Sequence, residues 1–425
     1  MRLLANASAN YVGAAAVVGL PILVLPFFVH ALGESTWGIV GLIVSIQSLL
    51  AALDTGFSQV LIREFALRSG ARGGSSQSGA DLLYSCERVY WFVALTIGVA
   101  GVVAALLVTM FVSAAPGHRW PVAAIAALCG GLLCAAQLPG FLYRSAVMGA
   151  QAQVRLNAIV ITAALARSVG GAVIVTLIPT VATYVIVSVV VLLLETLARR
   201  QLAWRVVGAI DSRIPWSARE FRAVLRDMSI LAVAVICGGF AAQADKLVVS
   251  AMLPVSTLAH YFIASQVALG ALQLIYPLTS AALPQVVQLS GSPRAQFRLN
   301  LRLFGIIAAL VVAGAVAYLL VGQAVLRLWL RHDDLANRVY GLLAFMLVGV
   351  AGNALCNVGY MRWLATNRVL GILGMNVAAL AVMLLLAPLL VDRWGEQGAA
   401  QAWIITGTLN LVLTCGWLKG ARGTD

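Results

Sequence analysis

The sequence predicts an all-α protein that crosses a membrane many times. Hydrophobic residues make up 62% of the 425 residues and charged residues only 10%, and long apolar runs alternate with short arginine-bearing turns. A soluble protein carries about a quarter charged residues, whereas about 20 apolar residues in a helix span the roughly 30 Å hydrocarbon core of a bilayer. Because no stretch is polar enough for a soluble domain, we expect a polytopic membrane protein.

The apolar runs predict about 12 transmembrane helices, six in each half of the chain. The first run is too long for a cleaved signal peptide and has no evident cleavage site, so we expect it to stay in the membrane. A turn at Pro179 separates the fifth and sixth spans. The expected spans are residues 10–30, 37–61, 89–113, 120–141, 156–178, 181–197, 228–250, 258–283, 303–323, 340–361, 370–391 and 399–418.

The basic residues predict the orientation of these helices. Of the 28 lysines and arginines, 21 fall in turns on one side of the predicted membrane and five on the other. Positive residues concentrate on the cytoplasmic side of membrane proteins, so we expect both termini in the cytoplasm. This distribution also explains the net charge of +13 and speaks against nucleic acid as a partner.

The longest connection, residues 198–227, is cytoplasmic and divides the spans six and six. Within it, Ser217 and Glu220 have the spacing of a capping box, which predicts a short interfacial helix. Since six is an even number, two such halves would have the same orientation and form a parallel repeat. Tyr143-Arg144 in the first half resembles Tyr360 and Arg362 in the second. The predicted parts are an N-terminal lobe, a linker and a C-terminal lobe: residues 1–205, 206–227 and 228–425.

Arg167 is the most unusual charge in the predicted spans. It lies eleven residues into the fifth span, about 16 Å from its cytoplasmic start. A charge in hydrocarbon costs at least about 2.5–3.5 kcal/mol, so its presence needs a reason. Either Arg167 lines a water-filled cavity and attracts an anionic group such as a phosphate, or it is a structural arginine bound by helix carbonyls.

Two further groups of charges leave alternatives open. Asp245 and Lys246 lie late in the seventh span. They form a proton- or ion-sensitive switch in a cavity wall, or Lys246 extends to the outer surface while Asp245 bonds a neighbouring helix.

Asp54 and Arg63, with Glu64, close the second span. They form an interfacial ion-pair cluster that fixes the helix end, or Arg63 receives an anionic headgroup.

Several amides and phenols lie within the spans, and they either line a polar path or make hydrogen bonds between helices. They are Asn10, Tyr11, Gln47, Gln243, Gln266, Asn353 and Asn376.

Motifs for catalysis, metal binding or nucleotide binding are missing from the sequence. It contains no G-x-x-x-x-G-K-[ST] phosphate-binding loop, no C-x-x-C pair and no metal-ligand spacing among its four histidines. The predicted outer loops are too short to carry the acid and base of a membrane glycosyltransferase. We therefore expect a protein that is not an enzyme and that has no cofactor and no metal.

Segments along nearly the whole chain resemble one known family. They are Asn10-Tyr11, PFFVHALG from Pro26 to Gly33, Trp37-Gly38, LDTGFSQVLIREFA from Leu53 to Ala66, AQADKLVVS in the seventh span, YPLTSAALP in the eighth, and Leu326–Leu330. This ordered set is similar to the polysaccharide or O-antigen flippases (the Wzx-like group) of the multidrug/oligosaccharidyl-lipid/polysaccharide exporter superfamily.

The resemblance implies two six-helix lobes around a central cavity that opens alternately to each side of a bacterial cytoplasmic (inner) membrane. It implies transport of undecaprenyl-pyrophosphate-linked oligosaccharide repeat units from the cytoplasmic to the periplasmic leaflet, with a polysaccharide polymerase and a chain-length regulator as candidate partners. The cavity of such flippases is cationic, and Arg167, Lys246 and Arg63 are the candidates here by position and charge. Coupling to protons or sodium through Asp245 or Asp54 is a hypothesis.

Two other functions fit the same composition. A multidrug exporter of the same superfamily would share the architecture, but such exporters carry acidic cation-binding residues, whereas the charge within these spans is mainly basic. An integral-membrane glycan polymerase would need a large outer loop, which the sequence lacks.

Overall fold

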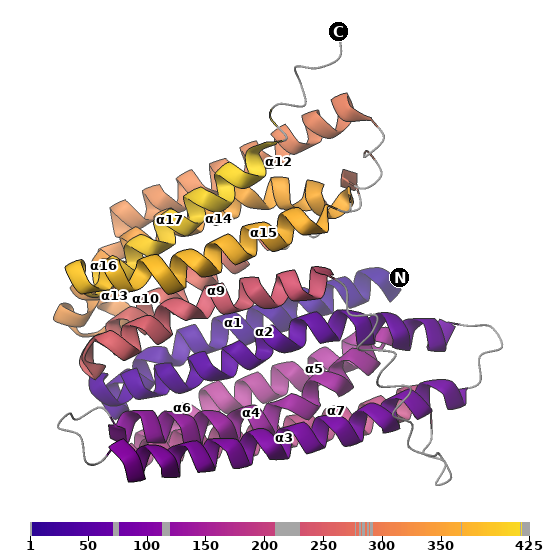
Figure 1. The fold of residues 1–425 in the computed structure, drawn as a ribbon, viewed down its shortest axis with the longest axis horizontal. Helices are drawn as coiled ribbons and strands as arrows, with labels where there is room; N and C mark the ends of the chain where they lie inside the picture. The colour runs from indigo at the N-terminus through magenta and orange to yellow at the C-terminus, as the bar shows by residue number, and fades with distance from the viewer. Residues whose placement is uncertain are drawn as a thin grey trace. The chain divides into compact units, whose positions relative to one another are not determined.

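The chain consists of long α-helices in the computed structural model (Figure 1). The structure describes residues 2–70, 76–112, 120–208 and 230–416, except for residue 367 and several residues between 277 and 291, and it also describes residue 418. Within this part of the chain there is no β-strand, and the predicted all-α class is confirmed. The helices form two compact units, which we call unit 1 (Met1–Ala232) and unit 2 (Val233–Asp425).

The helices of unit 1 run back and forth through short turns. Gly33 separates the first two at a φ of 79°, a left-handed conformation that glycine adopts without strain. The predicted turn at Pro179 is also present, and Thr180 caps the next helix by accepting a hydrogen bond from the Thr183 N–H at 3.0 Å. The elements are α1 (Arg2–Leu32), α2 (Glu34–Gly70), α3 (Ser76–Val112), α4 (Trp120–Gly149), α5 (Gln153–Leu165), η1 (Ala166–Gly170), α6 (Gly171–Leu177) and α7 (Val181–Val207).

Unit 2 has the same kind of architecture, and four of its helices begin after a proline, glycine or histidine: Pro254, Gly322, His332 and Gly395. The elements are α9 (Ile230–Met252), α10 (Val255–Gln273), α12 (Pro293–Ala317), η2 (Tyr318–Gly322), α13 (Gln323–Leu330), α14 (Asp333–Ala365), α15 (Val369–Ala381), η3 (Val382–Leu386), α16 (Ala387–Trp394) and α17 (Glu396–Thr414). The elements named η are single turns of π-helix, each with one extra residue in the turn.

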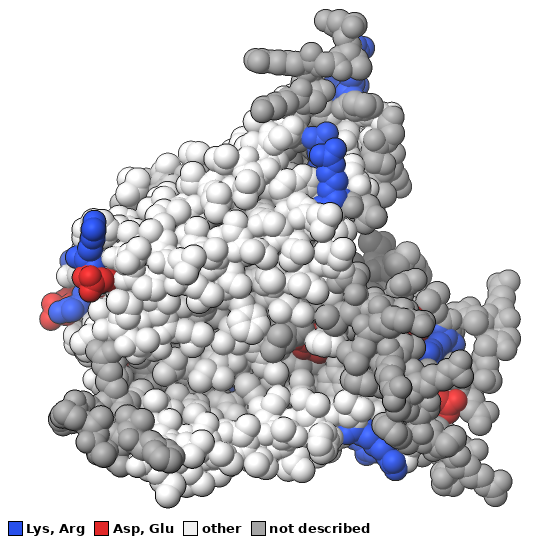
Figure 2. Space-filling model, viewed as in Figure 1, with Lys and Arg blue, Asp and Glu red and all other residues white. Residues whose placement is uncertain are grey.

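Eleven helices in the described residues are long and apolar enough to cross a membrane, and α17 lies where the twelfth span was expected. The protein is therefore a multi-pass membrane protein. On the face shown in Figure 2, most charged side chains lie toward the helix ends and the surface between them is almost free of charge. This is the pattern that hydrocarbon requires of a membrane-spanning surface.

Several helix boundaries differ from the predicted spans: α3 begins at Ser76 rather than at residue 89, for example, and α12 begins at Pro293 rather than at residue 303. Helix α7 continues to Val207, ten residues past the expected end at residue 197, because buried contacts at its charged end keep it helical. Helix α10 ends at Gln273 rather than at residue 283, and a turn at Leu274 and Ile275 follows it. The predicted interfacial helix at Ser217 lies outside the described residues.

The two units share a local pattern that supports a parallel repeat. In unit 1, a 13-residue helix (α5) is followed by the five-residue π-turn η1 and a seven-residue helix (α6). In unit 2, a 13-residue helix (α15) is followed by the five-residue π-turn η3 and an eight-residue helix (α16). The two π-turns thus occupy the same position in their helices.

Small residues allow α14 and α17 to pack closely in unit 2. A Cβ on Gly352 would lie 2.6 Å from the carbonyl carbon of Gly407, and one on Gly359 would lie 2.6 Å from the Cβ of Thr414. Such close backbone approach is a common way to stabilise helix pairs in membranes, where hydrophobic burial between helices contributes little.

We expect Gly352→Ala to destabilise the protein by about 1–3 kcal/mol, because the added methyl group must push α14 away from α17. The measurement is the fraction of the protein that elutes as a monodisperse peak after heating, with an apparent melting temperature lower by several degrees. Gly314→Ala is the matched control, since its Cβ would meet nothing within 4 Å. Equal melting temperatures for the two variants would contradict the proposed packing.

Candidate functional site

Arg167 lies on the π-turn η1, near the middle of the membrane-spanning segment Gln153–Leu177. Its side chain is half-buried, and it forms no hydrogen bond or ion pair with any other described residue. A π-turn widens the helix by one residue and redirects the side chains around it, and such turns frequently occur at functional sites. The structure therefore presents a mid-membrane cation whose hydrogen-bonding groups are available.

The equivalent residue of unit 2 indicates which way this position faces. Arg167 is the second residue of η1, and Met383 is the second residue of η3. Met383 is only 5% exposed and lines a cavity inside unit 2. The predicted parallel repeat implies that Arg167 likewise faces the interior of unit 1.

A second arginine of unit 1 is more buried than the sequence indicated. Arg199, on α7, was counted among the cytoplasmic turns, but its side chain is only 12% exposed. It pairs with Glu195 one turn earlier, and its Nε is buried without a partner among the described residues. Arg199 also interacts electrostatically with Arg144 and with Arg167. Three arginines and one paired carboxylate thus form a cationic cluster (Arg144, Arg167, Arg199 and Glu195) within unit 1.

Asp54 lies buried beside part of this cluster, with 6% of its surface exposed. Its Oδ2 accepts a hydrogen bond from the Ser58 hydroxyl at 2.5 Å, and Ser58 in turn accepts one from Ser145 at 3.1 Å. Its Oδ1 has no partner among the described residues, and its charge interacts with those of Arg144 and Arg199.

The expected ion-pair cluster at the end of α2 involves other residues than Asp54. Glu64 pairs with Arg68 at 3.7 Å, one turn further along the helix. Asp54 makes no ion pair within 4 Å in the described part of the chain, and the Arg63 side chain lies outside the described residues.

Glu87 shows how unit 1 satisfies a buried carboxylate. It accepts hydrogen bonds from the Tyr143 hydroxyl at 2.8 Å and from the Trp204 indole N–H at 3.0 Å, and it pairs with Arg200. Both oxygens are occupied, so this group joins α3, α4 and α7 rather than offering a binding site.

Asp245 and Lys246 form a similar network in unit 2. Lys246 is 3% exposed and donates to Asp245 at 3.2 Å, so the alternative in which it extends to the outer surface is wrong. The other Asp245 oxygen accepts hydrogen bonds from the Tyr261 hydroxyl at 2.7 Å and the Trp403 indole at 2.9 Å. Lys246 also lies 5.6 Å from the centre of the Trp403 ring. Although adjacent helical residues diverge by about 100°, the long lysine side chain reaches its neighbour.

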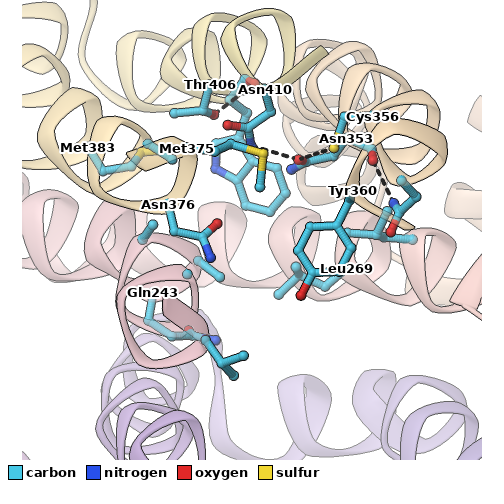
Figure 3. A pocket seen from close by; sticks show the side chains of 18 of the residues that line it. Gln243, Leu269, Asn353, Cys356, Tyr360, Met375, Asn376, Met383, Thr406 and Asn410 are labelled. Carbon is cyan, nitrogen blue, oxygen red and sulfur yellow. Dashed lines mark hydrogen bonds between the residues drawn. The ribbon is translucent and has the colours of Figure 1, made fainter. Parts of the chain in front are cut away.

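A cavity of about 450 Å³ lies within unit 2 among α9, α10, α14, α15 and α17. In Figure 3, Gln243, Tyr360 and Asn376 approach the same space from three of these helices. Among the described residues, no acidic or basic side chain lines this cavity. Its polar lining consists of Gln243, Gln273, Tyr276, Asn353, Asn357, Tyr360, Asn376, Thr406 and Asn410.

The predicted polar residues are thus only partly brought together. Gln243, Asn353 and Asn376 share the cavity of unit 2, whereas Gln47 donates to Gln137 within unit 1. Tyr360 and Asn410 were not predicted to line the cavity, although Tyr360 and Asn353 are seven residues apart and so lie on one face of α14. In the described residues, no group of three potential metal ligands occurs.

The fold was compared with those of known proteins. No protein-family model and no curated protein matches the sequence. A multidrug resistance MATE family transporter of the MOP superfamily, in an inward-facing conformation, is similar in structure with a TM-score of 0.72 and 16% identity, over 95% of this chain and 93% of that one. The lipid II flippase MurJ, in an inward closed conformation, gives a TM-score of 0.77 and 11% identity, over 97% and 87% of the two chains.

A third structure is a MOP superfamily transporter from Pyrococcus furiosus, described as having a binding pocket of reverse polarity. Its TM-score is 0.58 and its identity 15%, over 96% of this chain and 97% of that one. The chain therefore has the fold of MOP superfamily transporters.

We expect Asp245→Asn or Lys246→Met alone to destabilise the protein by about 3–5 kcal/mol, because each leaves a buried charge without its partner. The double variant should lose less than the sum of the two, since it leaves no charge unpaired. Thermal unfolding in detergent measures this, with Ser250→Ala on the same helix as the control. Additive losses would contradict the coupling of the two side chains.

Proposed function

We propose that the protein is a flippase that moves undecaprenyl-pyrophosphate-linked oligosaccharide repeat units from the cytoplasmic to the periplasmic leaflet by alternating access. In this proposal it lies in the cytoplasmic (inner) membrane of a bacterium with both termini in the cytoplasm. A polysaccharide polymerase and a chain-length regulator would act on the units that it delivers.

The observation that carries this proposal is the cationic cluster of unit 1. Hydrocarbon makes a charge costly, so a mid-membrane arginine without an ion-pair partner in the described residues favours a ligand that supplies the partner. The guanidinium group presents paired N–H donors that match phosphate oxygens, and a pyrophosphate offers two such groups. Arg167 and the partly unsatisfied Arg199 are therefore the leading candidates for contact with the headgroup.

The other cationic candidates rank lower. The Lys246 ammonium is already bound by Asp245 and by the Ala242 carbonyl at 3.2 Å, so it is less available to a ligand. Arg63 stays a candidate on the basis of the sequence alone.

A multidrug exporter is the second candidate function. The likeness to a MATE transporter and the free Oδ1 of buried Asp54 favour it. Against it, two arginines act on Asp54 electrostatically, and both oxygens of Asp245 are occupied. A cationic drug would meet more positive than negative charge, which favours an anionic cargo. A glycan polymerase gains no support from these groups.

Deletion of the gene should cause single lipid-linked repeat units to accumulate on the cytoplasmic face while surface polysaccharide disappears. We expect Arg167→Ala to restore transport at least tenfold less well than the wild-type gene. Arg167→Lys should restore more transport than Arg167→Ala because lysine keeps the positive charge, but less than the wild type because it lacks the paired N–H donors of arginine. The measurement is the leaflet distribution of extracted lipid-linked units, together with surface polysaccharide.

Arg155→Ala is the control for this test, since Arg155 lies on the same helix but is exposed at its end. Surface polysaccharide of normal amount and length in the deletion strain would reject the proposal and direct attention to drug efflux. Repeat units that reach the outer face unpolymerised would indicate a polymerase.

Ion coupling is a separate prediction. If Asp54 or Asp245 couples transport to protons or sodium, then Asp54→Asn or Asp245→Asn should abolish the dependence of transport on that ion gradient. The measurement is transport of a labelled lipid-linked unit in proteoliposomes with and without an imposed gradient. An unchanged ion dependence in both variants would remove these carboxylates from the coupling mechanism.

A further inference from the structure

The cavity of unit 2 differs chemically from the cationic cluster of unit 1. Its lining combines amides and phenols with methionine, leucine and tryptophan side chains, and none of the described residues that line it is charged. Its volume of about 450 Å³ falls in the range of small-molecule pockets, about 300–1,000 Å³. The ligand that fits such a lining is uncharged, with many hydroxyl groups and some apolar surface.

The nearest carboxylate is not available to a cation in this cavity. Asp245 lies behind the Trp403 wall with 0% exposure, and its two oxygens accept hydrogen bonds from Lys246, Tyr261 and Trp403. The indole N–H of Trp403 is likewise committed, so this residue offers the cavity only its ring. The network holds that ring in place as a rigid apolar wall.

Several polar groups of the lining have unused hydrogen-bonding capacity. Asn410 is 6% exposed and donates to Asn353 at 2.9 Å, while its own Oδ1 is buried without a partner in the described part of the chain. Asn376 donates to the Ala234 carbonyl at 2.7 Å, which fixes its amide across the cavity from α14. No hydrogen bond joins Gln243 or the Tyr360 hydroxyl to another described residue.

This pattern matches a sugar ring better than other uncharged ligands. An amide both donates and accepts, as a hydroxyl does, so amides from several helices can satisfy neighbouring hydroxyls of a pyranose. The apolar faces of the ring would pack against aromatic and methionine side chains by dispersion. A lipid tail would leave the amides unpaired at a cost in free energy, which disfavours it.

We infer that the cavity of unit 2 binds an uncharged sugar residue of the cargo. This inference rests on the proposed function, because the sugar belongs to the lipid-linked saccharide that the protein is proposed to carry. Gln243, Tyr360 and Asn376 supply the polar contacts, and Trp403 supplies the apolar wall.

The test compares the binding of defined probes to the full-length protein in lipid nanodiscs. The probes are radiolabelled farnesyl pyrophosphate and its conjugates with glucose, N-acetylglucosamine and glucuronic acid. At least one neutral-sugar conjugate should bind about tenfold more tightly than farnesyl pyrophosphate alone. Gln243→Leu and Tyr360→Phe should each reduce this preference about fivefold, the size of one lost hydrogen bond, while affinity for farnesyl pyrophosphate stays unchanged.

Gln243→Leu and Tyr360→Phe are suitable variants because neither side chain makes a hydrogen bond to another described residue, so folding should be preserved. Gln397→Ala, an exposed amide on α17, is the matched control and should keep the full preference. A water-filled cavity with no ligand would give equal affinities for all probes and would overturn the inference. A preference that persists in both variants, or one for glucuronic acid alone, would overturn it as well.

A variant of Arg167 distinguishes a failure of the sugar assignment from a failure of the proposed function. Arg167→Ala should weaken the binding of farnesyl pyrophosphate and of its conjugates by the same factor. If it has no effect while the sugar preference still depends on Gln243 and Tyr360, the pyrophosphate assignment fails and the sugar site stands. Displacement of the conjugates by ethidium in wild-type protein but not in Gln243→Leu would assign the cavity to cationic drugs and overturn the sugar assignment.

Discussion

Hydrocarbon offers no hydrogen bonds, so every polar group inside these helices must find a partner within the protein. Glu87 in unit 1 and Asp245 in unit 2 meet this requirement with the same set of donors: a tyrosine hydroxyl, a tryptophan indole and a basic side chain. Each joins three helices of its own unit. Against that background, the incompletely satisfied groups stand out. In the described residues such groups include Arg167, the Arg199 Nε and the Asp54 Oδ1 in unit 1, and the Asn300 Oδ1 and Asn410 Oδ1 in unit 2. The half-buried Arg167 is exposed enough for a ligand to reach, whereas the other four atoms are fully buried.

Hydrophobic patterning was sufficient to predict the fold class, most of the spans and the break at Pro179, because the bilayer dictates the length and composition of its helices. It could not predict where the helices end. Apolar runs mark the hydrocarbon boundary, whereas α7 continues to Val207 through contacts such as that of Trp204 with Glu87. The π-turns could not be predicted either. One extra residue in a turn hardly changes the sequence pattern of a helix that is apolar on every side.

Some of the site residues could likewise be predicted from the sequence, and others could not. Arg167 was visible in the sequence because a single charge in the middle of an apolar run has few explanations. Arg199 was not, because an arginine near the end of a span looks like part of a cytoplasmic turn until its packing against α4 is known. For Gln243, Asn353 and Asn376, the sequence gives three separate polar residues on three helices. Only the packing of α9, α14 and α15 shows that they face one cavity.

The repeat makes the contrast between the units informative. The π-turns η1 and η3 lie at the same position of their helices and carry Arg167 in unit 1 and Met383 in unit 2. The corresponding position is therefore cationic in one unit and apolar in the other. The difference extends beyond this pair: unit 1 gathers arginines around Asp54, whereas the cavity of unit 2 is lined by amides without a charge. A compact cationic ligand would match neither surface. The arginines of unit 1 favour an anionic group and the cavity of unit 2 favours an uncharged one, so the two units differ in the chemistry that each can bind.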